Sequence, residues 1–145
     1  MIPAIRLSKK SEYAIRALLH MASVPVGQIH SLHELCKKEN LPIKFVEQAL
    51  SALKNAGMVT SRRGARGGYM LAIPPERILI GDILSLLEGV TVSKEKTKPQ
   101  QTLSYRAFDC FQRQVSDNVE AHLCKRTLRE VLDLVPVTTA PDFMI

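Results

Sequence analysis

Residues 42–73 read PIKFVEQALSALKNAGMVTSRRGARGGYMLAI, and this stretch decides the fold. Pro42 suits the first turn of a helix. Apolar side chains then recur with helical spacing, at Phe45, Val46, Ala49, Leu50 and Leu53. Gly57 is placed to end the helix. Two short apolar segments, 58–60 and 69–73, flank a stretch rich in glycine and arginine, which predicts a β-hairpin with a long loop.

Two further helices are predicted upstream of this stretch. Ser8 is a candidate N-cap for a helix that runs to about Ser23 and stops at the turn 24–27. Ser31 with Glu34 three residues later forms a capping-box pattern for a short helix over 31–38. Three helices, the second short and tightly joined to the third, followed by a hairpin, are the element order of a winged helix-turn-helix.

The second half of the chain predicts a long helix beyond a polar stretch. A helix is expected from residue 81 or 82 to 88, and Thr127 with Glu130 starts a short one near the end. The long helix begins near Ser104. We expect a mainly α fold with a small β-hairpin: a winged helix-turn-helix domain over 1–90, a flexible loop over 91–104, a dimerisation helix and a short C-terminal helix over 105–135, and a tail over 136–145.

One apolar stripe runs along the long helix in steps of three or four residues. Its members are Phe108, Phe111, Val115, Val119 and Leu123. No later domain follows to cover this stripe, so it packs on the winged domain, on a partner chain, or on both. A second copy of the chain also supplies the two-fold symmetry that a palindromic DNA site needs.

The net charge of +6 over 145 residues lies entirely in the first half of the chain. Residues 1–77 hold 12 Lys and Arg against 5 Asp and Glu, a net charge of +7, whereas residues 78–145 have a net charge of −1. A basic half joined to a near-neutral half favours a polyanion-binding module attached to something else. A merely solvated basic surface is the alternative.

The composition indicates the compartment in which the protein is expected and argues against membrane-spanning and disulfide-rich proteins. No apolar run reaches the roughly 18 residues of a membrane span, and the N-terminus lacks the layout of a secretory signal. Three cysteines at wide spacings argue against a disulfide framework, and there is no CxxC pair. We therefore expect a soluble cytoplasmic protein with no membrane partner.

The third helix and the hairpin loop together suggest a surface that binds double-stranded DNA and reads its sequence, which we call the reading head. A helix fits the major groove, and Lys44, Gln48, Ser51 and Lys54 lie on its exposed side. The loop places Arg62, Arg63 and Arg66 among glycines, where arginine can bind phosphate or guanine or enter a narrow minor groove. An ordinary solvent-facing hairpin is the alternative.

The sequence resembles the Rrf family of bacterial transcriptional regulators (IscR-, NsrR-, CymR- and RirA-like proteins). The matching stretches are LSKKSEYA (7–14), PIKFVEQAL (42–50), LKNAGMV (53–59), RGARGGYML (63–71), IGDIL (80–84) and TLREV (127–131). The resemblance implies a homodimer paired through the long helix that reads a pseudo-palindromic operator. It also implies that Lys44, Phe45, Gln48 and Arg63 approach DNA.

The sequence departs from the resembled family where many members hold an iron–sulfur cluster on three loop cysteines. Residues 92–106 contain no cysteine. A non-standard iron–sulfur cluster would need Glu12 and Cys36, at positions that some members use as ligands, with Cys110 or Cys124 of a partner. The alternative makes Glu12 a surface carboxylate and Cys36 a small buried hydrophobe. No cofactor is favoured.

Cys110 and Cys124 are fourteen residues apart, so we expect them to share a helix face with Val115 and Val119 and to pack in the dimer seam. Reversible thiol oxidation is the alternative. The four histidines show no HxxxH or HExxH spacing, and surface or capping roles are expected for His30 and His33.

Three other functions compete with that of a regulator. The chain lacks a GxxxxGK[ST] loop, a GxSxG motif and a carboxylate–histidine cluster, which argues against an enzyme. A winged helix used for protein contact would favour apolar or acidic wing residues, and a sequence-independent chromosome binder is the third rival. The sequence favours a repressor that responds to redox, iron–sulfur or metabolite status, through a protein or small-molecule effector not yet identified.

Overall fold

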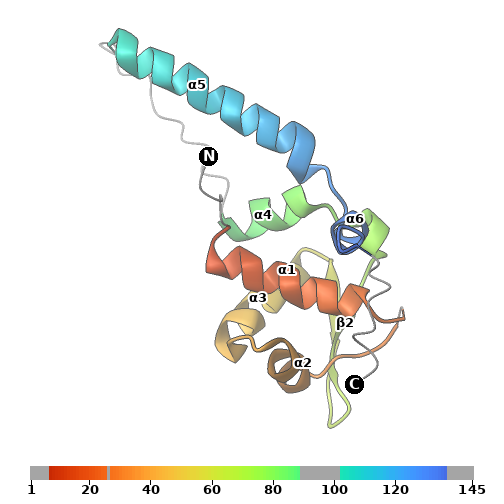
Figure 1. The fold of residues 1–145 in the computed structure, drawn as a ribbon. Coiled ribbons are helices and arrows are strands. Elements are labelled where there is room, and N and C mark those ends of the chain that lie inside the picture. Colours follow the sequence, from red (N-terminus) through yellow and green to blue (C-terminus); the bar gives the residue numbers. More distant parts are fainter. Residues whose placement is uncertain (1–6, 26, 89–101, 137–145) are drawn as a thin grey trace.

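The computed structural model describes residues 7–25, 27–88 and 102–136. Helices and one hairpin follow one another along these described ranges (Figure 1): α1 (Lys9–Ala22), α2 (Leu32–Glu39), α3 (Ile43–Asn55), β1 (Val59–Arg62), β2 (Gly68–Leu71), the short η1 (Pro75–Arg77), α4 (Ile80–Glu88), α5 (Leu103–Val119), the π-helical turn η2 (Glu120–Cys124) and α6 (Leu128–Leu132). The predicted winged helix-turn-helix and long C-terminal helix are confirmed. The predicted tail beyond residue 136 and the predicted loop, apart from residues 102–104, lie outside the described residues.

The predicted helix starts are confirmed by their caps. The hydroxyl of Ser8 accepts from the amide of Ser11 at 3.3 Å, and that of Ser31 accepts from Glu34 at 3.5 Å. The hydroxyl of Thr127 accepts from the amide of Glu130 at 3.1 Å. These bonds satisfy amides that a helix leaves without partners in its first turn. Each local cap thus fixes where its helix begins.

The turn between α2 and α3 sets the helix-turn-helix. Asn40 ends α2 in the left-handed conformation, with φ of 52°, which asparagine tolerates better than most residues. Pro42 is the N-cap of α3, one residue before the first-turn position that the sequence suggested. Gly57 follows α3 with φ of +79°, as predicted for the residue that ends this helix.

The hairpin is a two-stranded antiparallel sheet. Val59 pairs with Leu71, and Arg62 pairs with Gly68 at the loop end. The strands lie one or two residues away from the apolar segments used to predict them, because backbone pairing continues into the polar residues Ser61 and Arg62. Outside the hairpin, His30 forms an isolated antiparallel bridge with Tyr69 and so adds one paired residue to the edge of β2.

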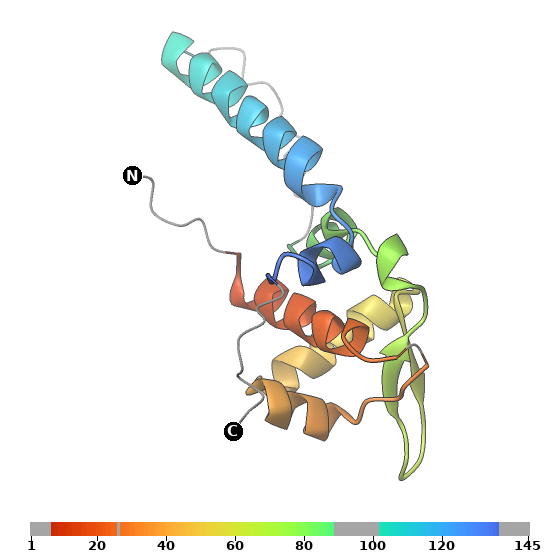
Figure 2. The same cartoon turned by 45° about the vertical axis from the view of Figure 1, so that its right-hand side comes forward.

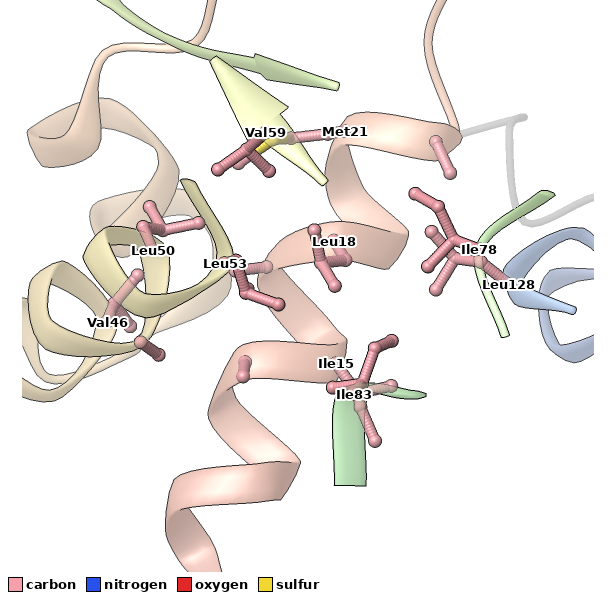
Figure 3. Packing of buried hydrophobic residues seen from close by; sticks show 14 of the residues in the cluster. Ile15, Leu18, Met21, Val46, Leu50, Leu53, Val59, Ile78, Ile83 and Leu128 are labelled. Carbon is pink, nitrogen blue, oxygen red and sulfur yellow. The ribbon is translucent and has the colours of Figure 1, made fainter. Parts of the chain in front are cut away.

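Leu18 of α1 lies at the centre of the hydrophobic core (Figure 3). Residues of α3 and β1 pack on one side of it, and Ile78, Ile83 and Leu128 pack on the other. The core residues with less than 2% exposure include Leu18, Leu35, Val46, Leu50, Leu53, Val59, Ile78, Ile83 and Leu128. The core therefore draws on both halves of the chain.

The segment 126–128 joins α6 to the stretch before α4. The amide of Leu128 donates to the carbonyl of Ile78 at 2.8 Å, and the amide of Ile80 donates to the carbonyl of Arg126 at 2.9 Å. Leu128 is fully buried. The chain thus comes back to the winged body along α5 and completes the same core with α6.

The long helix α5 extends away from this body in both views (Figures 1 and 2). None of its residues is buried. Its apolar stripe is exposed: Phe108 61%, Phe111 59%, Val115 45%, Val119 39% and, in η2, Leu123 54%. Within the described part of the chain, no helix is long and apolar enough to cross a membrane.

Candidate nucleic-acid interface

Helix α3 separates a buried face from a polar face. Val46, Ala49, Leu50 and Leu53 are buried against the core. The predicted contact residues Lys44, Phe45, Gln48 and Ser51 are all exposed. Lys44, Glu47, Gln48 and Ser51 line a shallow open depression on this face. An exposed helix with these donors and acceptors has the dimensions and chemistry to enter a major groove.

The depression also contains Glu47, which the sequence analysis did not select. Its carboxylate accepts hydrogen bonds and can accept from the exocyclic amine of cytosine. It lines the same depression as Lys44 and Gln48, and the residue spacing in α3 alone was sufficient to find it.

The first turn of α3 is open to an anion. Pro42 gives no side-chain cap, so amides of the first turn remain available at the positive end of the helix dipole. Beside this turn the ring of Phe45 lies 6.3 Å from that of Tyr13, and Lys9 Nζ lies 5.9 Å from the Tyr13 ring centre. Lys9 and Tyr13 of α1 therefore join α3 in one surface, a contact between distant segments that periodicity does not reveal.

The wing, which we define as β1, β2 and the loop between them, displays its three arginines. Arg62 ends β1, Arg63 and Arg66 lie in the loop, and all three are exposed. The loop turns tightly, with the amide of Gly67 donating to the carbonyl of Gly64 at 2.9 Å. A Cβ on Gly67 would collide with the carbonyl of Arg62, so a residue without a side chain is required there.

The base of the wing is fixed to the helix-turn-helix through His30. The amide of His30 donates to the carbonyl of Tyr69 at 2.7 Å, and the amide of Tyr69 donates back at 2.8 Å. The expected surface or capping role of His30 is wrong, because its side chain is only 7% exposed. His33, three residues later, is exposed.

The wing tip and the helices α2 and α3 project from the end of the molecule that faces away from α5 (Figures 1 and 2). The basic wing and the polar face of α3 are therefore separated from the exposed apolar stripe. Such an arrangement leaves both surfaces free to engage different partners at once.

The candidate metal ligands do not meet within one chain. Glu12 lies 3.2 Å from Lys9 and 3.9 Å from Arg16, so it is paired with cations at the surface. Cys36 is buried in the core, and burial raises the pKa of its thiol, which disfavours the thiolate that binds metal. Across the described ranges, no three His, Cys, Asp or Glu side chains gather to hold an ion.

The relation expected for Cys110 and Cys124 is wrong. In the α-helical part of α5, Val115 and Val119 lie about 140° and 180° around the axis from Cys110, at 100° per residue, so Cys110 lies on the side away from the stripe. Cys110 is exposed. Cys124 lies instead in the π-helical turn, against Gly81 of α4. The prediction from the fourteen-residue spacing assumed a regular α-helix and did not allow for the extra residue that a π turn inserts.

Residues 7–134 match the Rrf2 family, described as an iron-dependent transcriptional regulator. The chain belongs to the Rrf2 family. Its members are transcriptional regulators of the helix-turn-helix type that bind DNA, and not enzymes. The donor set of the described residues does not fit a resident iron site built within a single chain, for the reasons given above for Cys36 and Glu12.

Known relatives and solved structures agree with the assignment of the chain to the Rrf2 family. The HTH-type transcriptional regulator CymR of Bacillus subtilis is 38% identical over 85 residues, which cover 59% of this chain and 62% of CymR. The chain therefore matches about three fifths of the length of such curated relatives. The structure of B. subtilis CymR superimposes with a TM-score of 0.75 at 29% identity and covers 92% of this chain and 100% of that one. T. potens IscR gives 0.73 at 29% identity, with 97% and 96% covered.

Proposed function

We propose that this Rrf2-family regulator binds a pseudo-palindromic operator as a homodimer and acts as a repressor. In this proposal residues 1–90 form the DNA-binding unit, and residues 105–135 supply the dimerisation helix and the short α6. The observation that carries the proposal is the pairing of an exposed polar face on α3 with an arginine wing at the same end of the molecule.

The chemistry of the two elements is complementary. Gln48 on α3 can pair with adenine through two hydrogen bonds, and Lys44 and Ser51 can contact phosphates or bases. Arg62, Arg63 and Arg66 carry a planar fork that suits phosphate, guanine or a narrow minor groove. Acidic or large apolar wing residues would favour a protein partner. The stretch 62–68 contains no acidic residue, and its one apolar side chain is the methyl group of Ala65.

The stripe on α5 supports the dimer. Two phenylalanines and two valines are exposed on one side of a helix that projects from the body. Apolar surface of this size on a projecting helix favours association, and pairing with a second copy places two reading heads about a two-fold axis. Phe108, Phe111, Val115, Val119 and Leu123 are the proposed interface.

We further propose that the signal acts without a resident cofactor. A partner protein, a small ligand or thiol oxidation are the routes that remain, and the exposed Cys110 is the thiol open to an oxidant. A redox or metabolite signal fits this set. A non-standard cluster on Glu12, Cys36 and a cysteine of a partner subunit is the competing arrangement.

The test begins by selecting an operator from random DNA and measuring its affinity by fluorescence anisotropy. Arg63→Ala and Gln48→Ala should each weaken operator binding by about 1–3 kcal/mol. The matched control is Arg129→Ala, because Arg129 is a cation on α6 paired with Asp133 at 3.3 Å. Affinity should also fall steeply with salt. A double variant with wild-type affinity would exclude this reading head, and equal affinity for operator and random DNA would identify a sequence-independent binder.

A further inference from the structure

A partly buried cluster joins α1, the segment before α2 and the end of α2. The rings of His20 on α1 and His30 before α2 meet edge to face, with centres 5.3 Å apart and planes at 80°. Nδ1 of His20 donates to a carboxylate oxygen of Glu39, at the end of α2, over 2.7 Å. Arg16 donates to the carbonyl of Glu39 at 2.7 Å and lies 3.9 Å from its carboxylate.

His30 differs from its neighbours in this cluster because one nitrogen of its ring is both buried and unpartnered among the described residues. Nε2 of His30 is buried and, among the described residues, has no hydrogen-bond partner. The same residue makes both backbone bonds to Tyr69 at the base of the wing. A Cβ on Gly68 would collide with the carbonyl of His30, so the wing strand and the segment carrying His30 lie in direct backbone contact.

We propose that His30 is a positioning residue for the wing: it holds the wing against the helix-turn-helix only while its imidazole is neutral, and acidification releases the wing and weakens operator binding. The effect on operator binding rests on the proposed function. The contact between His30 and the wing, which we call the clamp, is a property of the free protein.

The groups around His30 oppose a positive charge on its ring. Burial lowers the pKa of His30 below its ordinary value of 6.5, and the nearby His20 and Lys38 lower it further. Of the other groups in the cluster, Glu39 is already engaged by His20 and Arg16, and Tyr69 meets His30 through its backbone. A proton on the ring would therefore stay uncompensated in the clamped state.

The direction of the pH effect follows from this lowered pKa. The open form, with His30 in water, takes up the proton near pH 6.5, before the clamped form does. The clamp is therefore fully stable above that pH and weakens as the pH falls toward the lowered value. The clamped form excludes one proton that the open form binds. The equilibrium between the clamped and open forms therefore changes by at most about tenfold per pH unit for each subunit, or about a hundredfold for a dimer in which both wings are needed.

The first experiment measures the clamp without DNA. The hydrogen-exchange protection of the Tyr69 amide, corrected for intrinsic exchange, should fall between pH 7.5 and 5.5 in the whole protein, whereas that of core amides in α1 should hold. An NMR titration of the His30 ring in the clamped protein should give a midpoint below 6.5, and the loss of protection should lie between pH 6.5 and that midpoint. Protection of Tyr69 that stays constant over this interval would overturn the proposal.

The second experiment measures operator affinity at the same two pH values. His30→Phe keeps an aromatic ring and removes the titrating group. The operator affinity of this variant should therefore lack the part of the pH dependence that His30 contributes in the wild type. His33→Phe is the matched control, because His33 is exposed and lies outside the cluster, and it should keep the wild-type dependence. Equal pH dependence in wild type and His30→Phe would overturn the proposal, whereas failure of wild type to bind operator at pH 7.5 would count against the proposed function instead.

A surface variant covers the case in which His30→Phe does not fold. Lys38 is exposed, so Lys38→Gln should leave the fold intact and remove one of the charges that disfavour protonated His30. The His30 midpoint should then move to higher pH, and the loss of Tyr69 protection between pH 7.5 and 5.5 should become smaller, because the clamped form then resists the proton less. If the midpoint moves and the size of the protection loss stays the same, the ring does not control the clamp.

Discussion

Gly81 lies so close to Cys124 that a methyl group on its Cα would come within 2.8 Å of both the Cβ and the carbonyl oxygen of Cys124. Gly81 is in the first turn of α4, and Cys124 ends the π-helical turn that follows α5. This contact fixes the point at which the long helix departs from the winged body.

Gly81→Ala should therefore destabilise the protein. The backbone carbonyl of Cys124 cannot swing aside as a side chain can, so the junction of α4 and η2 must shift, at a cost of about 1–3 kcal/mol. Urea unfolding monitored by circular dichroism measures the change. Ser85→Ala, at an exposed position of the same helix, is the control and should have little effect. A wild-type midpoint for Gly81→Ala would show that the junction has room to adjust.

Leu128→Ala should lower the free energy of unfolding by about 2–5 kcal/mol. Leu128 is fully buried against Ile78, and its removal leaves a cavity in the core. Leu134→Ala is the matched control, since Leu134 is 59% exposed. If the two variants unfolded alike in a denaturant titration, α6 would not belong to the core.

Val119→Glu should convert the protein to monomers and abolish operator binding at nanomolar concentration. Val119 lies within the exposed stripe. In a dimer paired through this stripe, the introduced glutamate of one subunit would face the same negative charge on the other. Light scattering coupled to size exclusion gives the mass. Gln114→Glu, off the stripe on the same helix, should remain dimeric. A dimer that survives at Val119→Glu would place the interface elsewhere.

Ser11→Ala should cost about 1 kcal/mol at neutral pH. The hydroxyl of Ser11 donates to Glu88 at 2.6 Å, Ser8 donates to the same oxygen, and these bonds lower the pKa of Glu88 below its ordinary value of 4.5. A lowered carboxyl pKa gives stability that is complete above 4.5 and is lost as the pH falls through the lowered value. Unfolding free energies at pH 7 and pH 3 should therefore show a smaller penalty at pH 3. Ser116→Ala, exposed on α5, should show no such dependence.

Protein purified without oxygen should show no visible iron–sulfur absorption. Cys36 is enclosed in the core with a raised pKa, and Glu12 is held by Lys9 and Arg16. A band that disappears in Cys36→Ala would instead establish the mixed site assembled between subunits.

The sequence predicted those features of the fold that depend on short-range chemistry. Ser8, Ser31 and Thr127 each bond to an amide three residues away, so the cap and the helix start appear in the same few residues. The apolar periodicity of α3 separated its buried face from Gln48 and Ser51 for the same reason. The strands were less well placed, because their ends depend on pairing across the hairpin.

Contacts between distant segments escaped prediction. The bond from Ser11 to Glu88 spans 77 residues, and the burial of His30 arises from β2 and α1 closing over it. The π-helical turn that ends at Cys124 changed which face that residue occupies. Nothing in the local sequence distinguishes His30 from His33, although one is enclosed and the other is exposed.

The place of Leu128 in the core affects how the protein is made. During synthesis, α1, α2, α3 and the wing leave the ribosome before α5, but the core around Ile78 stays open until α6 emerges and inserts Leu128. A nascent chain that stops within α5 therefore exposes that part of the core to solvent. A cut in α5 by a protease would separate the reading head from the residue that closes it. The proposed dimerisation helix must therefore be synthesised before the core of the winged body can close.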